Sequence, residues 1–92
     1  MTTALPYEVE WTPSALRSLG QLPEKVATAV VQFVFGPLAE NPQRVGHELH
    51  FELEGKHSAR RGEHRIVYEI DDDRRVVVII AADHRGTIYR SR

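Results

Sequence analysis

A basic cluster within residues 55–70 carries the side chains best suited to binding phosphate. Its cations are Lys56, Arg60, Arg61 and Arg65. Arginine meets phosphate oxygens with a planar fork of donors. The cluster runs into a strand-like alternation that ends in Tyr68 and Ile70, and a strand holds its side chains in fixed positions on two faces. The pattern predicts a phosphate-binding surface built on one face of a small sheet.

A second cluster, at residues 83–90, adds side chains that can carry protons. It includes His84, Arg85 and Tyr89 and follows a long apolar run. Cleavage of a ribose phosphate needs an acceptor for the 2′-OH proton, a donor to the departing 5′ oxygen, and cations around the phosphorane. Tyrosine or histidine suits the first two tasks and arginine the third. Because each of these residues alone could be ordinary surface, the prediction depends on the two clusters meeting on adjacent strands.

Alternation within residues 63–70 separates a core face from a face turned away from the helices. The outer set is Arg65, Val67 and Glu69, and the core set is Ile66, Tyr68 and Ile70. Tyr68 is therefore expected to be structural. Arg65 could bind phosphate, but the pattern also allows a solvated charge or a salt bridge to Glu69.

Composition indicates one small globular domain over residues 1–92. The chain is 41% hydrophobic and 27% charged, which is ordinary for a folded domain of this size. It has no cysteine, so a disulfide framework and a thiolate metal site are excluded, and a cytoplasmic protein is the simple interpretation. No apolar run approaches the roughly 18 residues needed to cross a bilayer, so no membrane partner is expected.

The net charge of −1 hides an asymmetry between the two parts of the chain. Residues 1–54 hold three cations against seven acids, a balance of −4, whereas residues 55–92 hold nine cations against six acids, a balance of +3. Such a distribution is a better guide to a binding face than the sum. It favours an anionic partner for the C-terminal part.

The N-terminal half predicts a strand and two helices. Residues 7–11 alternate as a half-buried strand, and Thr12-Pro13 is typical of a helix start. This first helix should run through Leu19, with Gly20 ending it in a left-handed conformation. A second helix opens at Pro23-Glu24, and Gly36-Pro37 must end or kink it. Val26, Val30, Phe33 and Val34 form its apolar stripe.

The C-terminal half predicts an antiparallel three-strand meander over residues 56–61, 63–70 and 75–82. Gly62 suits the first hairpin and residues 71–73 the second turn. The last strand lacks alternation, which indicates burial on both sides. Residues 42–54 are interpreted as a loop with a short strand. The fold class is therefore α+β: an N-terminal strand, an αα-hairpin and a small sheet with helices on one face.

Other catalytic motifs are missing from the chain. His47-Glu48-Leu49-His50 is H-x-x-H, which lacks the spacing of the zinc-binding H-E-x-x-H helix. There is no P-loop, no Gly-x-Gly-x-x-Gly fingerprint and no Gly-x-Ser-x-Gly elbow. Neither a metal nor a cofactor is indicated.

Five short segments stand in an order found in one toxin superfamily. They are Leu53-Glu54-Gly55, Ser58-Ala59-Arg60-Arg61-Gly62, His64-Arg65-Ile66-Val67-Tyr68, Asp83-His84-Arg85 and Ile88-Tyr89-Arg90. From Tyr7 onward the chain resembles the RelE branch of the RelE/ParE superfamily. Residues 35–38, 41–42 and Arg44 are also similar to those of its actinobacterial members. The Arg-Ile-Val-Tyr element is shared by ribonucleases and gyrase poisons of this superfamily.

The resemblance implies the toxin of a type II toxin–antitoxin module, an mRNA interferase that cleaves mRNA in the ribosomal A site. In that family the 2′-OH attacks its own phosphate with the help of basic side chains and without metal. The implied partners are the ribosome, mRNA and a RelB-like antitoxin encoded alongside. The antitoxin would carry the DNA-binding module for transcriptional autoregulation, so operator DNA would be contacted only through it.

Catalytic positions carried over from the resemblance are few. Arg65 matches a phosphate-binding arginine and Arg85 the arginine after the last strand. Tyr89 matches a tyrosine proposed to act in acid–base chemistry or base stacking. His84, beside Arg85, joins this set as a proton carrier.

RNA-binding positions are Lys56, Arg60, Arg61 and His57. Lys56 matches the first of two lysines in the best-known member of the family, and Arg60 matches a further cation of the same strand. Ser58 stands where the second lysine would be, so the general base stays open among His84, His57 and Glu48.

Two other functions fit the same sequence. A ParE-like inhibitor of DNA gyrase would use the shared superfamily elements without cleaving RNA. Alternatively, the serine at position 58, in place of the second lysine, indicates a weakly active toxin that would act mainly in autoregulation. The histidine, arginine and tyrosine near the C-terminus favour the nuclease, because a pure binder needs no proton carriers.

Overall fold

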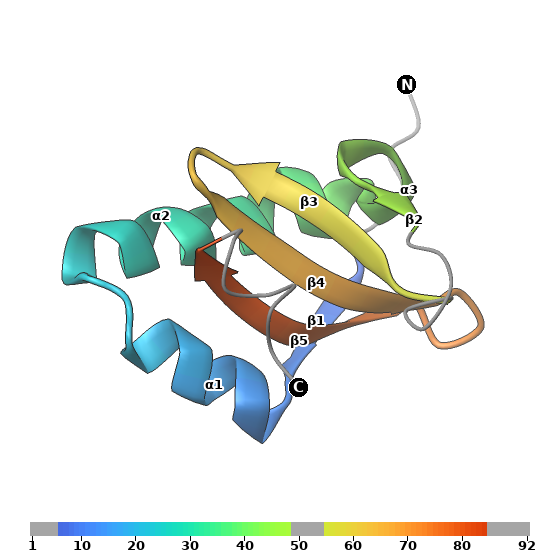
Figure 1. Ribbon diagram of the computed structural model, residues 1–92. Helices are drawn as coiled ribbons and strands as arrows, with labels where there is room; N and C mark the ends of the chain where they lie inside the picture. Colours follow the sequence, from blue (N-terminus) through green and yellow to red (C-terminus); the bar gives the residue numbers. More distant parts are fainter. Residues whose placement is uncertain (1–5, 49–54, 85–92) are drawn as a thin grey trace.

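The computed structural model describes residues 6–48 and 55–84, which form a sheet covered by helices on one face (Figure 1). The sheet has five strands in the order β1-β5-β4-β3-β2. The predicted α+β class and the antiparallel meander are confirmed. No helix in these two ranges is long and apolar enough to span a membrane.

The N-terminal strand and first helix follow the prediction except at the helix end. β1 (Glu8–Trp11) lies at the sheet edge, parallel to β5 (Val76–His84). α1 (Pro13–Gly20) begins after Thr12, whose hydroxyl accepts a hydrogen bond from the Ala15 N–H at 3.0 Å. The predicted left-handed cap at Gly20 is wrong: Gly20 belongs to the helix, and Gln21 follows in a right-handed conformation. The turn hydrogen bonds from the Gln21 and Leu22 N–H groups need no glycine there.

The second helix changes form where the glycine–proline pair was expected to interrupt it. α2 (Glu24–Phe33) passes into a π-helical turn, η1 (Val34–Leu38). Gly36, at φ −108° and ψ −107°, departs from helical geometry just before Pro37. Val30 and Val34 are buried, as the apolar stripe predicts. A short helix, α3 (Pro42–Val45), and a two-residue strand, β2 (His47–Glu48), then follow.

The meander consists of β3 (His57–Arg61), β4 (His64–Asp71) and β5. Gly62 turns the first hairpin with φ +63°. The second turn occupies residues 72–75 and uses Arg75 at φ +55°, so it is longer than the predicted 71–73.

The prediction that β5 is buried on both sides is wrong. Helices cover only one face of the sheet, so Val77 and Ile79 are fully buried whereas Val78 is partly exposed. The register shifts between Val67 and Tyr68, which pair with residues 81 and 79. Residue 80 is therefore an extra residue in β5, and such a bulge interrupts alternation.

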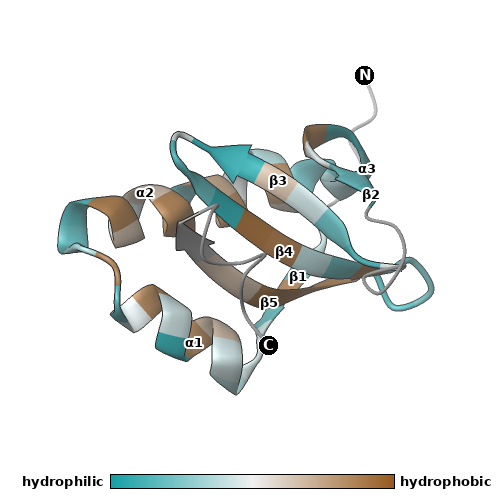
Figure 2. Cartoon of the chain, in the orientation of Figure 1, coloured by the Kyte–Doolittle hydropathy of each residue, from teal (hydrophilic) through white to brown (hydrophobic). Residues whose placement is uncertain are grey.

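The core lies between this sheet and the helices, and the hydropathy colouring of Figure 2 shows the apolar residues along β4, β5 and the helices. Its fully buried members include Ala15, Val34, Ile66, Tyr68 and Ile79. The predicted core positions Ile66 and Tyr68 are confirmed. Ile70 is only partly buried at the edge of the same cluster.

Candidate functional site

A polar pocket lies on the sheet face that the helices leave open. Arg60 on β3 stands opposite Arg65 on β4, and Ser58 on β3 stands opposite His47 on β2. Directly opposite residues share a face of an antiparallel pair. The pocket measures about 360 Å³ and is lined by Val45, Gly46, His47, Ser58, Arg60 and Arg65. Two guanidinium side chains and an imidazole thus converge on one hollow.

Three residues hold β2 close enough to β3 to complete this pocket. The Tyr68 hydroxyl, fully buried, donates a 2.6 Å hydrogen bond to the Pro42 carbonyl and so anchors α3. Burial raises the pKa of Tyr68 to about 12, because the phenolate would lose its hydration. Gly46 comes next, and a methyl group there would overlap the Ser58 carbonyl and lie 2.6 Å from the Tyr68 hydroxyl. Only glycine permits this approach.

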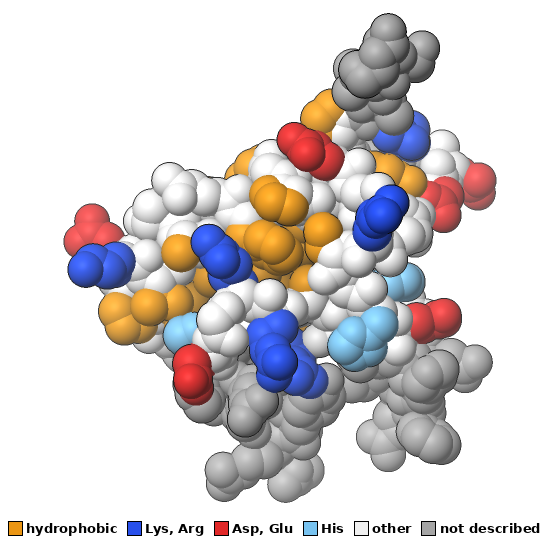
Figure 3. Space-filling view, turned by 90° about the horizontal axis from the view of Figure 1, so that it is seen from above, with side chains coloured by type: hydrophobic (Ala, Val, Ile, Leu, Met, Phe, Trp, Pro, Cys, Tyr) orange, Lys and Arg blue, Asp and Glu red, His pale blue; other side chains and the backbone are white. Residues whose placement is uncertain are grey.

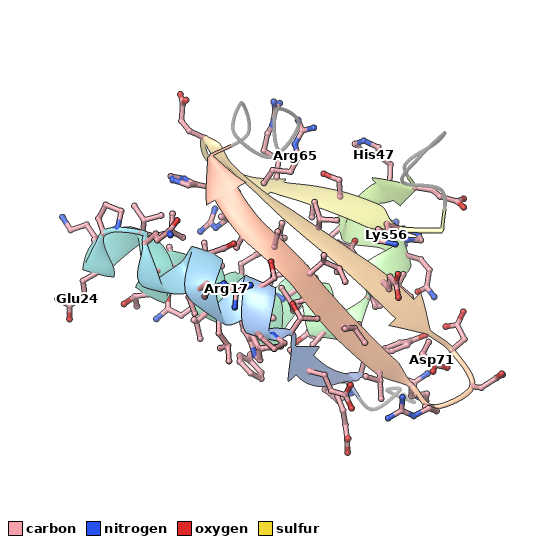
Figure 4. The ribbon with its side chains drawn as sticks, turned by 60° about the horizontal axis from the view of Figure 1, so that its bottom comes forward. Arg17, Glu24, His47, Lys56, Arg65 and Asp71 are labelled. Atoms are coloured by element: carbon pink, nitrogen blue, oxygen red, sulfur yellow. The ribbon has the colours of Figure 1, made fainter. Side chains whose placement is uncertain are left out.

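The cations of the site come from neighbouring strands. Figure 4 shows Arg65 and His47 on the side of the sheet away from helices α1 and α2, which carry Arg17 and Glu24. In register, Arg65 lies between Arg60 and Asp83. Because Arg60 and Arg65 stand directly opposite each other, both can donate hydrogen bonds to one anion in the pocket.

Lys56 lies at the margin of the same face and is already paired. Its Nζ is 2.9 Å from a carboxylate oxygen of Glu69, and the Lys56 side chain is 29% exposed. Glu69, considered from sequence as a partner for Arg65, makes this ion pair with Lys56. An RNA phosphate would have to compete with Glu69 for Lys56.

His57 and Arg61, both predicted to bind RNA, lie on the opposite face. The His57 ring stacks on Tyr68 with centroids 5.6 Å apart. Arg61 lines a second hollow of about 310 Å³ against α2, together with Lys25, Val26, Ala29, Val30, Gly62, Glu63 and His64. Figure 3 shows an apolar area here, flanked by basic side chains and histidines. Successive side chains of a strand point to opposite faces, so residues 57 and 61 lie on one face of β3 and residues 58 and 60 on the other. Their contact with RNA stays a prediction.

The C-terminal catalytic candidates are only partly described. His84 ends β5 and pairs in register with His64. Arg85 and Tyr89 lie outside the described residues. The predicted meeting of Arg65 with these two residues therefore stays a prediction.

His47 is a site residue that the sequence analysis did not select. Its position was considered only within the H-x-x-H pattern, whose His50 lies outside the described residues. The one sequence signal for β2 was the Pro42 and Gly46 pair, which marks a short turn before residue 47. This turn brings the chain back alongside β3. The strand parity of residue 47 follows only once its pairing with Ser58 is known.

A family model and two known proteins, all toxins of toxin–antitoxin systems or named as toxins, are similar to this chain. The model of a family described as the ParE toxin of the type II toxin–antitoxin system parDE matches residues 9–89. Toxin RelE of Mycobacterium tuberculosis (strain ATCC 25618 / H37Rv) is 54% identical over 85 residues, covering 92% of this chain and 88% of that toxin. Toxin RelG of the same organism is 50% identical over 86 residues, covering 94% and 99%.

Solved structures agree with these relatives. The toxin–antitoxin complex RelBE2 from Mycobacterium tuberculosis contains a chain that superposes with a TM-score of 0.87 at 46% identity, covering 94% of this chain and 99% of that one. The intact Escherichia coli RelBE complex gives a TM-score of 0.70 at 18% identity, covering 85% and 95%. The latter likeness shows the shared fold.

Proposed function

The chain belongs to the ParE toxin family of type II toxin–antitoxin systems, and we propose that this RelE-like toxin acts by cleaving mRNA on the ribosome. The observation that carries the proposal is the polar pocket in which Arg60 and Arg65 face each other beside His47. It offers two planar donors to one phosphodiester, next to a side chain that can carry a proton.

The proposed reaction begins with binding of the scissile phosphate between Arg60 and Arg65. Their guanidinium groups stabilise the negative charge that grows on the phosphorane as the 2′ oxygen attacks. A base of the site takes the 2′-OH proton as the O2′–P bond forms. The P–O5′ bond breaks, and the departing O5′ takes a proton from an acid of the site or from water, which gives a 2′,3′-cyclic phosphate and a 5′-hydroxyl end. Arg85 and Tyr89 are proposed to complete the site from the C-terminal segment.

The ribosome is proposed to supply most of the substrate positioning. The chain has a net charge of −1, and Lys56 is engaged by Glu69, so the open face offers few cations to free RNA. Affinity for nucleic acid depends on the number of phosphates neutralised. A site that binds free RNA weakly can still act when the ribosome holds the mRNA in a reactive geometry.

A RelB-like antitoxin is the proposed protein partner. The similar chain of the Mycobacterium tuberculosis structure comes from a toxin–antitoxin complex. In the present chain Leu16 and Phe35 are 54% and 56% exposed, and the hollow between α2 and the β3–β4 hairpin is largely apolar. A partner with apolar and acidic residues would cover these surfaces and neutralise the cations near the open face.

A single-turnover cleavage assay on programmed ribosomes tests the proposal. Purified wild-type toxin should cut an mRNA positioned in the A site, whereas Arg65→Ala should be slower by about 100-fold or more, as for loss of an oxyanion-stabilising donor. Arg17→Ala, which removes an exposed arginine from α1, is the matched control and should cleave normally. Circular dichroism would establish that each variant is folded. Equal rates for folded Arg65→Ala and wild type would contradict the proposal.

Gyrase inhibition is the second candidate, and the ParE description of the matching family model favours it. The nuclease is preferred because the pocket combines paired arginines with a histidine. Expression in cells separates the two: new mRNA 5′ ends support cleavage, while an SOS response with DNA breaks and intact transcripts supports gyrase as the target.

A further inference from the structure

Among residues 6–48 and 55–82, whose side chains the structure describes, His47 is the histidine on the open face. It is exposed, and it stands opposite the buried Ser58 in the two-residue ladder of β2 and β3. Within the same ranges, His57 stacks on Tyr68 and His64 lines the hollow against α2. Glu48 pairs with His57 in register and so belongs to their face. His47 is thus the described proton carrier that shares a pocket with Arg60 and Arg65.

We infer that His47 is the general base that takes the proton from the attacking 2′-OH. The inference rests on the proposed function and deepens it by assigning this step to a residue of β2. Opposite positions on paired strands hold side chains about 5 Å apart, and Arg60 is one pleat along the same face from Ser58. A phosphate between the arginines would therefore lie within reach of the His47 imidazole, with the ribose hydroxyl beside it.

The step is balanced without a further reactant except water. The neutral imidazole nitrogen of His47 accepts the proton of the 2′-OH as the O2′–P bond forms. The P–O5′ bond breaks, and the departing O5′ takes a proton from water or from another acid of the completed site. His47 then returns its proton to solvent. No electron is transferred.

The local structure keeps His47 in place for this task. Gly46 brings β2 into contact with β3, and the Tyr68–Pro42 hydrogen bond fixes the short helix before it. Because the His47 side chain itself is exposed, its replacement should leave the core intact. Loss of activity in a His47 variant can therefore be assigned to the site.

His47→Gln and His64→Gln form a matched pair for the test. In single-turnover cleavage of ribosome-bound mRNA, His47→Gln should be slower by about 100-fold or more, the usual contribution of a general base. His64→Gln, which alters a histidine on the opposite face, should cleave at the wild-type rate. Ribosome binding by His47→Gln, measured by co-sedimentation, should be unchanged.

Chemical rescue distinguishes a catalytic role of His47 from a structural one, because added imidazole can replace a missing base but cannot restore a lost structural contact. Added imidazole should raise the cleavage rate of His47→Ala at least several-fold and leave wild type unaffected. A His47→Gln rate within about threefold of wild type, or loss of ribosome binding without imidazole rescue, would overturn the inference. Those results leave the proposed function standing if wild type cleaves and Arg65→Ala does not. Failure of the wild type to cleave would overturn both.

Discussion

Tyr68→Phe removes a single hydroxyl group from beneath the polar pocket. That hydroxyl is fully buried and donates a 2.6 Å hydrogen bond to the carbonyl of Pro42, which is also buried. The variant keeps the ring and its stacking with His57 but leaves the carbonyl without this donor. The hydrogen bond joins residues 26 positions apart, so its loss should loosen α3 and β2 relative to the sheet.

The expected cost follows from leaving a buried acceptor unsatisfied, which is about 1–3 kcal/mol. A loss of ~2 kcal/mol would lower the melting temperature of a domain of this size by about 8–16 °C. Urea unfolding at pH 8 measures the free energy directly. A loss below ~0.5 kcal/mol would refute the reasoning that this bond anchors α3.

The pH dependence gives an independent check on the same residue. Burial raises the pKa of Tyr68 from 10.0 in the unfolded chain to about 12 in the folded protein. As pH rises, the Tyr68 phenol therefore loses its proton first in the unfolded state. Its contribution to the free energy of unfolding is complete below pH 10 and is lost as pH rises toward about 12. The two-unit difference corresponds to about 3 kcal/mol. The stability advantage of wild type over Tyr68→Phe should shrink across this window, and a constant advantage would contradict the assignment.

Three further variants test neighbouring features. Gly46→Ala should lower the free energy of unfolding by about 1–3 kcal/mol through overpacking against β3, and an unchanged urea midpoint would show that β2 can move aside without cost. Thr12→Ala should cost about 1–2 kcal/mol because the hydroxyl caps α1 and also donates to the Ile79 carbonyl at 3.0 Å, whereas Thr12→Ser should recover most of the loss in thermal melts. Glu69→Gln should change the free energy of unfolding by less than about 1 kcal/mol. It should release Lys56 for phosphate, so that single-stranded RNA binds more tightly and its binding depends more steeply on salt concentration. An unaltered salt dependence would remove Lys56 from the RNA-binding residues.

Features that depend on local sequence were predictable. Alternation in β4 correctly divided Arg65 from Ile66 and Tyr68, because a strand places successive side chains on opposite faces. The Gly36-Pro37 pair predicted the interruption after α2, because proline cannot continue the helical hydrogen bonding.

Features that depend on distant contacts were not predictable in this way. β2 exists because Gly46 fits against the Ser58 carbonyl and Tyr68 reaches Pro42, and neither contact has a local sequence signal. The pocket with His47 therefore escaped the sequence analysis. The bulge in β5 was hidden in a uniformly apolar run, where an extra residue changes no pattern.

Mapping of transcript 5′ ends after brief induction of the toxin tests the central claim most directly. A reporter mRNA should be compared with the same transcript lacking its ribosome-binding site, in cells expressing wild type, Arg65→Ala or Arg17→Ala. The account predicts new 5′-hydroxyl ends within the translated reading frame for wild type and Arg17→Ala, and none for Arg65→Ala or the untranslated transcript. Growth arrest by wild type with intact transcripts would contradict it.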